Sequence, residues 1–312
     1  MTGYQRLAVA TCVATFILII VGAVVRTTGS GLGCPDWPKC HGQFIPPFEK
    51  EVLIEYTHRL SASVVSTLVL ATAAVAWFKH RQNTRLVQLA VASLGLLAFQ
   101  VILGGVTVLN DLPPEVVTAH LATALALFAV LLSMTVLIFE EGREPGTDQS
   151  RAVAIQPWLI FGALALYILL LTGSYVVGSG ASLVSLDWPL VNNKLFPSGA
   201  EGITRRLLEI QWLHRFSVLI VGLCLGFVAA KVLKGTTDAR VRLLARLVVG
   251  LYVAQIFVGA ANIWTKLSVW AASGHLAVGA AIWAALVVMF VLNRLAVGQR
   301  AARTAPAASL AQ

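Results

Sequence analysis

Eight stretches of mainly apolar residues run through this sequence and limit the folds open to it. Of its 312 residues, 58% are hydrophobic and only 12% are charged, whereas about a quarter of the residues in a soluble domain are charged. A helix needs about 20 consecutive apolar residues to cross the bilayer core. The sequence therefore predicts an all-α membrane protein with eight transmembrane helices, at about residues 7–25, 53–78, 86–109, 115–139, 156–177, 206–230, 243–265 and 269–292.

The basic residues indicate how these helices are oriented. Of the 23 Lys and Arg residues, 14 fall on the side that holds both termini and nine on the other side. Positive residues are concentrated in the cytoplasmic loops of membrane proteins. We therefore expect both termini in the cytoplasm and the protein in the cell membrane, meaning the inner or plasma membrane. The net charge of +9 reflects this orientation, so no nucleic-acid partner is expected.

The two halves of the chain are similar to each other. Residues 100–120 align without gaps with residues 255–275, and the loop "GSGLGCPDWPKC" has a counterpart in "GSGASLVSLDWPLV". Each half holds an even number of helices, so the two copies have the same orientation in the membrane, as parallel repeats do. The expected units are an N-terminal four-helix bundle (1–139), a cytoplasmic linker (140–155), a C-terminal four-helix bundle (156–293) and a cytoplasmic tail (294–312).

Two of the four cysteines lie in the first outer loop, within "CPDWPKCH". Disulfides form and persist on the outer side of a membrane, so a bond between Cys34 and Cys40 is the favoured interpretation, and a free dithiol stays open. Covalent haem attachment needs C-x-x-C-H, which this spacing does not provide. Cys12 and Cys224 lie within apolar segments and are expected to be ordinary packing residues.

Four histidines recur at one depth in the even-numbered helices. Each lies about six residues, or about 9 Å, from the outer end of its helix. Any one of them alone is most simply a hydrogen-bonded packing residue. Two facing imidazoles, however, suffice as axial ligands of haem iron, so the repetition predicts two haem sites. The four residues are His58, His120, His214 and His275.

The neighbours of these histidines are consistent with haem binding. Small residues surround His120 and His275, where they would let a flat macrocycle approach, although small residues also serve helix packing. Arg59 and Arg215 directly follow two of the histidines. A charge at this depth needs compensation, and haem propionates would supply it. The alternative is that both arginines extend to the outer interface.

One position differs between the two repeated sites. Glu55 lies three residues before His58, whereas Gln211 lies three residues before His214. Residues three apart share a helix face, so each side chain is expected in the pocket of its histidine. A carboxylate can accept or donate a proton and an amide cannot, so only the first site is predicted to perform chemistry. The alternative is that Glu55 pairs with Arg59 on the helix surface.

These residues resemble those of the haem A synthase family, in particular its bacterial members with a cysteine pair. The family consists of membrane proteins that convert haem O to haem A for haem-copper oxidases. The matching features are "TGSGLGCPDWPKCHG" in the first loop, "EYTHR" in the second helix, "HR" in the sixth helix, and the histidines of the fourth and eighth helices. They extend over nearly the whole chain.

The resemblance implies an eight-helix fold of two four-helix bundles. It implies that His214 and His275 hold a haem b, and that Glu55, His58 and His120 form the pocket for the substrate haem O. It also implies an oxidoreductase that hydroxylates a haem methyl group in successive steps. The methyl group becomes a formyl group after loss of water.

The resemblance further implies partners. Haem O synthase, a protohaem farnesyltransferase, would supply the substrate, and haem-copper oxidase assembly would use the product, while the electron donor is unknown. Some members have a second cysteine pair where this chain has Ser185 and Val191, so one disulfide is expected.

Two other classes of function stay open on the residues alone. A dihaem, cytochrome b-like electron-transfer subunit would also need paired histidines, but it has no need for a carboxylate at only one haem. A transporter with parallel repeats would fit the duplication, but the middle of the membrane lacks paired charges.

Overall fold

The computed structural model describes residues 1–142, 149–198 and 200–304. Within these ranges it contains eight long helices, and all of them are long and apolar enough to cross a membrane. This confirms the all-α prediction and the predicted number of spans. The helices are α1 (Gly3–Thr27), α2 (Lys50–Lys79), α3 (Thr84–Leu109), α4 (Pro114–Glu140), α5 (Gln149–Gly178), α6 (Gly202–Gly235), α7 (Ala239–Trp264) and α8 (Val269–Thr304).

Several helices extend beyond the apolar ranges predicted for them. α6 begins with a polar turn that includes Arg205, α5 begins inside the expected linker, and α8 continues into the expected tail. Hydropathy marks only the part of a helix that can lie in lipid, whereas backbone hydrogen bonding continues through polar turns. Residues 143–148 of the expected linker and 305–312 of the expected tail lie outside the described residues.

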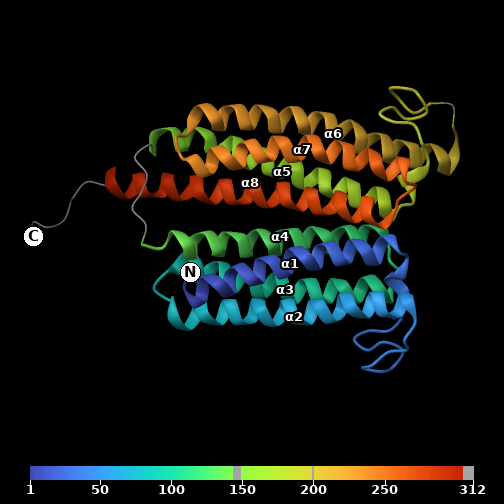
Figure 1. The fold of residues 1–312 in the computed structure, drawn as a ribbon, viewed down its shortest axis with the longest axis horizontal. Helices are drawn as coiled ribbons and strands as arrows, with labels where there is room; N and C mark the ends of the chain where they lie inside the picture. Colours follow the sequence, from blue (N-terminus) through green and yellow to red (C-terminus); the bar gives the residue numbers. More distant parts are fainter. Residues whose placement is uncertain (143–148, 199, 305–312) are drawn as a thin grey trace, which may run out of the picture.

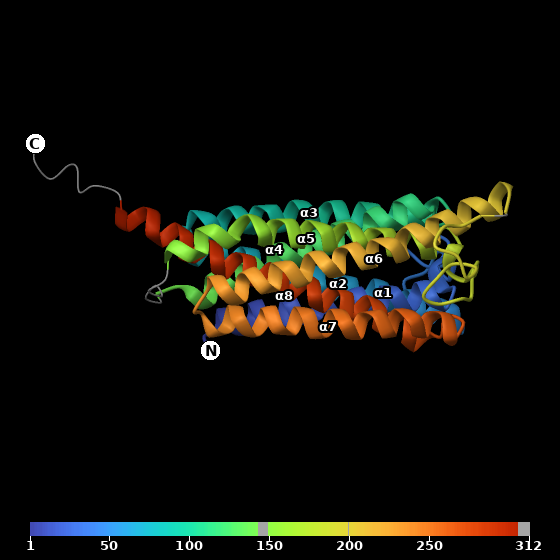
Figure 2. The ribbon, with the colours of Figure 1, turned by 90° about the horizontal axis from the view of Figure 1, so that it is seen from above.

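The helices lie in two groups of four, α1–α4 and α5–α8 (Figure 1). Their long axes run in broadly the same direction, as the view turned by 90° shows (Figure 2). Between the groups, α4 contacts α5 and α8, and α1 contacts α8. The seam between the two groups is therefore built from α1, α4, α5 and α8.

Aromatic side chains bind α4 at this seam. The indole N–H of Trp283 on α8 donates to the carbonyl of Leu125 over 3.0 Å, and the hydroxyl of Tyr167 on α5 donates to the carbonyl of Ala122 over 2.8 Å. The rings of Tyr167 and Trp283 also contact each other, with centroids 5.2 Å apart. α4 is thereby fixed relative to both α5 and α8.

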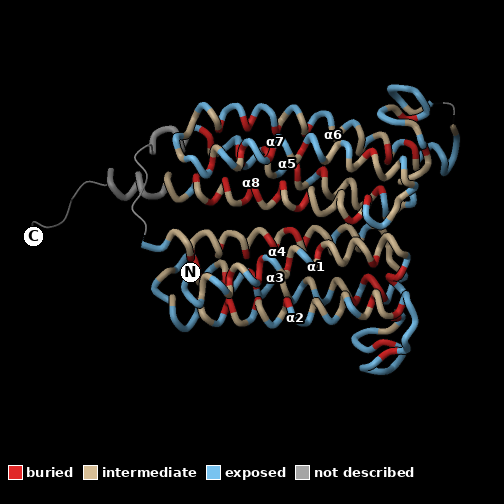
Figure 3. Tube along the Cα trace, in the orientation of Figure 1, coloured by how far each residue is buried: buried red, intermediate tan, exposed pale blue. Residues whose placement is uncertain are grey.

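Large apolar side chains are exposed on many of the helices. Examples are Phe78, Phe161 and Leu223, which are 78%, 57% and 70% exposed. Figure 3 shows the buried positions between neighbouring helices and the exposed positions on the outer sides of both groups. Such exposure is ordinary where the surroundings are lipid tails, which are as apolar as these side chains.

Two loops of similar structure lie at one end of the molecule, which we call the loop end (Figure 1). One joins α1 to α2 and the other joins α5 to α6. Each starts with a 3₁₀ turn, η1 (Ser30–Leu32) or η2 (Ala181–Leu183). Each also contains one isolated β-bridge, between Cys40 and Gln43 or between Val191 and Lys194. The loops therefore repeat each other in structure as well as in sequence.

The cross-link at the base of the first loop is a disulfide between Cys34 and Cys40, which decides between the alternatives left by the sequence. In the second loop, Ser185 and Val191 take the equivalent positions. The backbone N–H of Asn192 donates to Oγ of Ser185 over 3.0 Å. A single hydrogen bond thus stands where the first loop has a covalent bond.

A carboxylate organises the tip of the first loop. The backbone N–H groups of Gly42 and His41 donate to Asp36 over 2.8 and 2.6 Å. These hydrogen bonds hold the pKa of Asp36 below its usual range. The ring of His41 contacts the carbonyl of Gly33 through Nε2 at 2.9 Å, so this histidine belongs to the loop and is separate from the four intrahelical ones.

We expect Cys34 and Cys40 to resist alkylation when the protein is denatured without reductant, because their sulfurs are bonded to each other. Cys12 and Cys224, which are free thiols, serve as internal controls and should be labelled in the same sample. Mass spectrometry of the peptides measures this. Labelling of Cys34 and Cys40 in freshly isolated membranes would contradict the disulfide.

Candidate haem-binding sites

The four repeated histidines lie on α2, α4, α6 and α8. His120 and His275 follow the first residue of their helices by about six residues, as expected, whereas His214 lies about twelve residues into α6, because that helix begins with an additional polar turn. All four side chains are partly buried. His58 interacts electrostatically with His120, and His214 interacts in the same way with His275. The structure therefore brings the histidines together in two pairs, one in each group of helices.

Each histidine ring packs against a glycine of the preceding helix. The pairs are His58 with Gly22, His120 with Gly104, His214 with Gly173 and His275 with Gly259. A Cβ atom at these glycines would lie 3.3, 3.2, 3.0 and 2.9 Å, in that order, from the ring atom Cε1. Any larger residue would therefore push the ring aside. The contacts between glycine and histidine are closer in the second group of helices than in the first.

The ring of His214 is fixed by a hydroxyl group. Oγ1 of Thr172 donates to the carbonyl of Leu169 over 2.8 Å and lies 2.9 Å from Nδ1 of His214. Because the hydroxyl proton is used by the carbonyl, the oxygen accepts the proton of Nδ1. The lone pair of Nε2 is then left available for a metal, which is the usual arrangement of a ligating histidine.

The first group of helices lacks this hydroxyl. Val21 precedes Gly22 just as Thr172 precedes Gly173, and the buried Nδ1 of His58 has no hydrogen-bond partner among the residues that the structure describes. The two sites therefore share their histidines and glycines and differ in how tightly the rings are oriented.

Arg59 and Arg215 hold the loops. Arg59 donates through Nη1 to the carbonyls of Asp36 and Lys39 over 2.7 and 2.8 Å, and through Nη2 to that of Cys34 over 2.8 Å. Arg215 donates to the three equivalent carbonyls, those of Asp187, Leu190 and Ser185. Both guanidinium groups are thus engaged by the protein, and their predicted contact with haem propionates stays a prediction.

Glu55 is buried, with 4% of its surface exposed. Its Oε1 accepts a hydrogen bond from Nε of Arg59 over 2.9 Å, so the ion pair considered as an alternative does form. Within the described residues, Oε2 of Glu55 makes no hydrogen bond. The carboxylate is therefore oriented through one oxygen, and the other oxygen remains available for a proton.

Gln211, at the equivalent position, is used differently. Its Nε2 donates to the carbonyls of Ser182 and Ser185 over 2.7 and 3.2 Å, which ties α6 to the second loop. The amide therefore performs a structural task. Arg215 makes its three carbonyl contacts with an amide at the position of Glu55, while Asp187 of the loop interacts with it electrostatically. The carbonyl contacts of Arg59 therefore do not require a carboxylate at position 55.

The family model for COX15-CtaA, described as cytochrome oxidase assembly protein, matches residues 5–287. The chain belongs to this family. A protein of Shouchella clausii named heme A synthase is 34% identical over 229 residues, which is 72% of this chain and 74% of that protein. Proteins of the same name from Geobacillus kaustophilus and Lysinibacillus sphaericus are 30% and 29% identical, covering 86% of this chain and 84% and 88% of their own lengths.

The histidine pairs of this family member fit haem. Each pair offers two imidazoles inside an apolar bundle, which is the donor set of a bis-histidine haem. Within the described residues, no group of three or more His, Cys, Asp or Glu side chains could hold a metal ion. The glycines opposite the rings keep bulk away from the ligand side chains.

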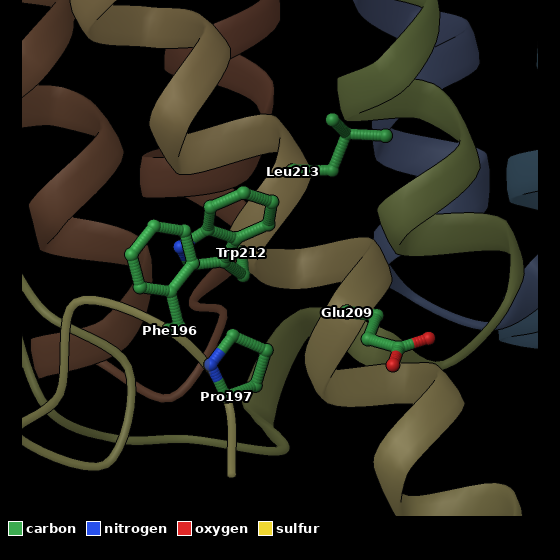
Figure 4. A pocket seen from close by; sticks show the side chains of 5 residues that line it. All are labelled: Phe196, Pro197, Glu209, Trp212 and Leu213. Atoms are coloured by element: carbon green, nitrogen blue, oxygen red, sulfur yellow. The ribbon is translucent and has the colours of Figure 1, made fainter.

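A surface hollow at the loop end lies away from these pairs. Phe196, Pro197, Glu209, Trp212 and Leu213 line it, with the first two on the second loop and the others on α6 (Figure 4). Glu209 pairs with Arg205 over 2.9 Å. The indole of Trp212 donates to the carbonyl of Leu195. The Trp212 hydrogen bond attaches the loop to α6.

Three features of the sites were not predicted from the sequence, namely the four glycines, Thr172 and the amide of Gln100. Nε2 of Gln100 lies 3.2 Å from Nε2 of His120. One signal was available. Gly104 and Gly259 occupy the same position of the gapless alignment of residues 100–120 with 255–275. A glycine retained in both copies of a helix often marks a close approach.

We expect Gly259→Ala to lower the thermal stability of the purified protein, because the new Cβ would lie 2.9 Å from Cε1 of His275. Overpacking of this kind costs about 1–3 kcal/mol. Gly250→Ala on the same helix is the control, since a Cβ there meets nothing within 4 Å. Removing a helical glycine should raise stability slightly. Equal melting temperatures for the two variants would contradict the close contact.

Proposed function

We propose that this chain is a haem A synthase, a membrane oxidoreductase that converts a methyl group of haem O into a formyl group. The observation that carries the proposal is the buried carboxylate of Glu55, three residues before His58, where the second group of helices has Gln211 three residues before His214. The names of the similar proteins and the assembly role of the family support the same activity.

The two pairs take different tasks in this proposal. His214 and His275 hold a resident haem b, which when bound supplies one-electron transfer. Two contacts support this assignment. His214 donates a hydrogen bond to Thr172, and the glycines of the second group of helices lie closer to their histidine rings than those of the first group. His58 and His120 hold haem O, the substrate, and Glu55 faces it.

Glu55 handles protons in the substrate pocket. Two successive hydroxylations followed by loss of water turn the methyl group into a formyl group, and each stage moves protons. A carboxylate within reach of the reacting group can accept and return them. Arg59 holds Oε1 of Glu55, so Oε2 is the oxygen assigned to this exchange.

The proposal also includes the membrane topology and the partners of the protein. Residues 1–139 and 156–293 are the two parallel-repeat bundles, joined by a cytoplasmic linker at 140–155, with both termini and the tail at 294–312 in the cytoplasm. The loop end then faces the outside of the inner or plasma membrane. Haem O synthase delivers the substrate, and the product is used in haem-copper oxidase biogenesis.

We expect Glu55→Gln to give a folded protein that retains its haem b and forms haem A about 10² to 10⁴ times more slowly, which is the typical worth of acid–base assistance. The amide oxygen can still accept the hydrogen bond of Arg59. Arg215 holds the second loop beside an amide, so the clamp should survive. Chromatography of extracted haems at matched protein levels is the measurement.

The control for this variant is Glu51→Gln, one turn earlier on α2, where the carboxylate is exposed. This change removes the same charge outside the pocket and should leave haem A formation at the wild-type level. If Glu55→Gln forms haem A as fast as the control, Glu55 serves only as the ion-pair partner of Arg59.

A further inference from the structure

Gln100 and Gln255 occupy equivalent positions in the two groups of helices. Gln100 lies on α3, 20 residues before His120, and Gln255 lies on α7, 20 residues before His275. Both side chains reach the fourth helix of their group. The comparison between them is direct, because the segments that carry them align without gaps.

The two amides bind different atoms of their histidines. Nε2 of Gln100 lies 3.2 Å from the ring atom Nε2 of His120, whereas Nε2 of Gln255 donates to the backbone carbonyl of His275 over 2.7 Å. Nε2 is the ring atom that the Thr172 contact leaves available in His214. Gln100 therefore occupies the iron-binding atom of its histidine, and Gln255 leaves that atom accessible.

The two glutamine amides differ in the residue that they meet on the fourth helix of their group. Gly279 lies one turn after His275, and a Cβ there would come within 3.2 Å of Nε2 of Gln255. The first group of helices has Ala124 at this position. By this equivalence, the methyl group of Ala124 would crowd an amide placed as that of Gln255 is, and the amide of Gln100 contacts the imidazole ring instead.

We propose that Gln100 is a positioning residue that competes with haem iron for Nε2 of His120 and so makes the first site exchangeable. This inference rests on the proposed function and deepens it, because a substrate site must release its product. Haem O binding breaks the contact between Gln100 and His120, and release of the product restores it. In the second site Gln255 binds the backbone carbonyl of His275, so it does not compete for the ring and the haem is retained.

The test is the rate at which haem O leaves the purified full-length protein. The protein is loaded with haem O without an electron donor, and excess apomyoglobin captures the haem that dissociates, which changes the absorbance. The His120→Ala variant identifies the phase that belongs to the first site. We expect Gln100→Leu to slow this phase by about 2- to 10-fold, the effect of removing one competing hydrogen bond.

Two further variants separate competition from general damage. Ala124→Gly keeps the amide but opens the space that Gln255 uses, so it should slow the same phase. Gln255→Leu is the matched control and should leave this phase unchanged. An unchanged or faster phase in both Gln100→Leu and Ala124→Gly would overturn the inference, and so would the absence of a His120-dependent phase in the wild-type protein.

The assay does not depend on turnover, so the two ideas can fail separately. Slower release in Gln100→Leu from a protein that makes no haem A would leave the competition intact and refute the proposed reaction. Unchanged release from variants of a protein that makes haem A normally would refute only the competition.

Discussion

A helix bundle in lipid must satisfy its polar groups from within, because the surroundings offer no water to hydrogen-bond them. The same need is met at the loop end, where helix side chains bind backbone carbonyls of both loops, most of them part-buried. Arg59 and Arg215 each bind three of these carbonyls. The loops are thereby fixed to α2 and α6, the helices that carry His58 and His214.

The two halves share the arrangement of helices and histidines that their sequence similarity predicts, but they differ at positions near the histidines. The histidines, the opposing glycines and the arginine clamps are common to the two halves. Among the differences between the halves are small substitutions in contact with the rings or one turn away, such as Val21 against Thr172 and Ala124 against Gly279. Each changes the hydrogen bonding of one imidazole or one amide. Together they favour a retained haem in one half and an exchangeable one in the other.

The sequence predicted the eight helices because hydropathy over about 20 residues directly reports membrane-spanning length. It predicted the histidine pairs because duplication repeats a rare residue at one depth, and it favoured the bond between Cys34 and Cys40. It did not predict the glycine contacts or the contact between Gln100 and His120, because these depend on which helix faces meet. The partners of Arg59 could not be predicted either, because they are backbone carbonyls, which every residue has.

The most direct test of the central claim is to co-express the protein with a haem O synthase in cells that make no haem A, and to separate the extracted haems by chromatography. The account predicts a haem A peak that requires this protein. Extracts that contain haem O and haem b but no haem A or hydroxylated intermediate, from cells with well-folded protein, would contradict it and would indicate a dihaem electron-transfer protein.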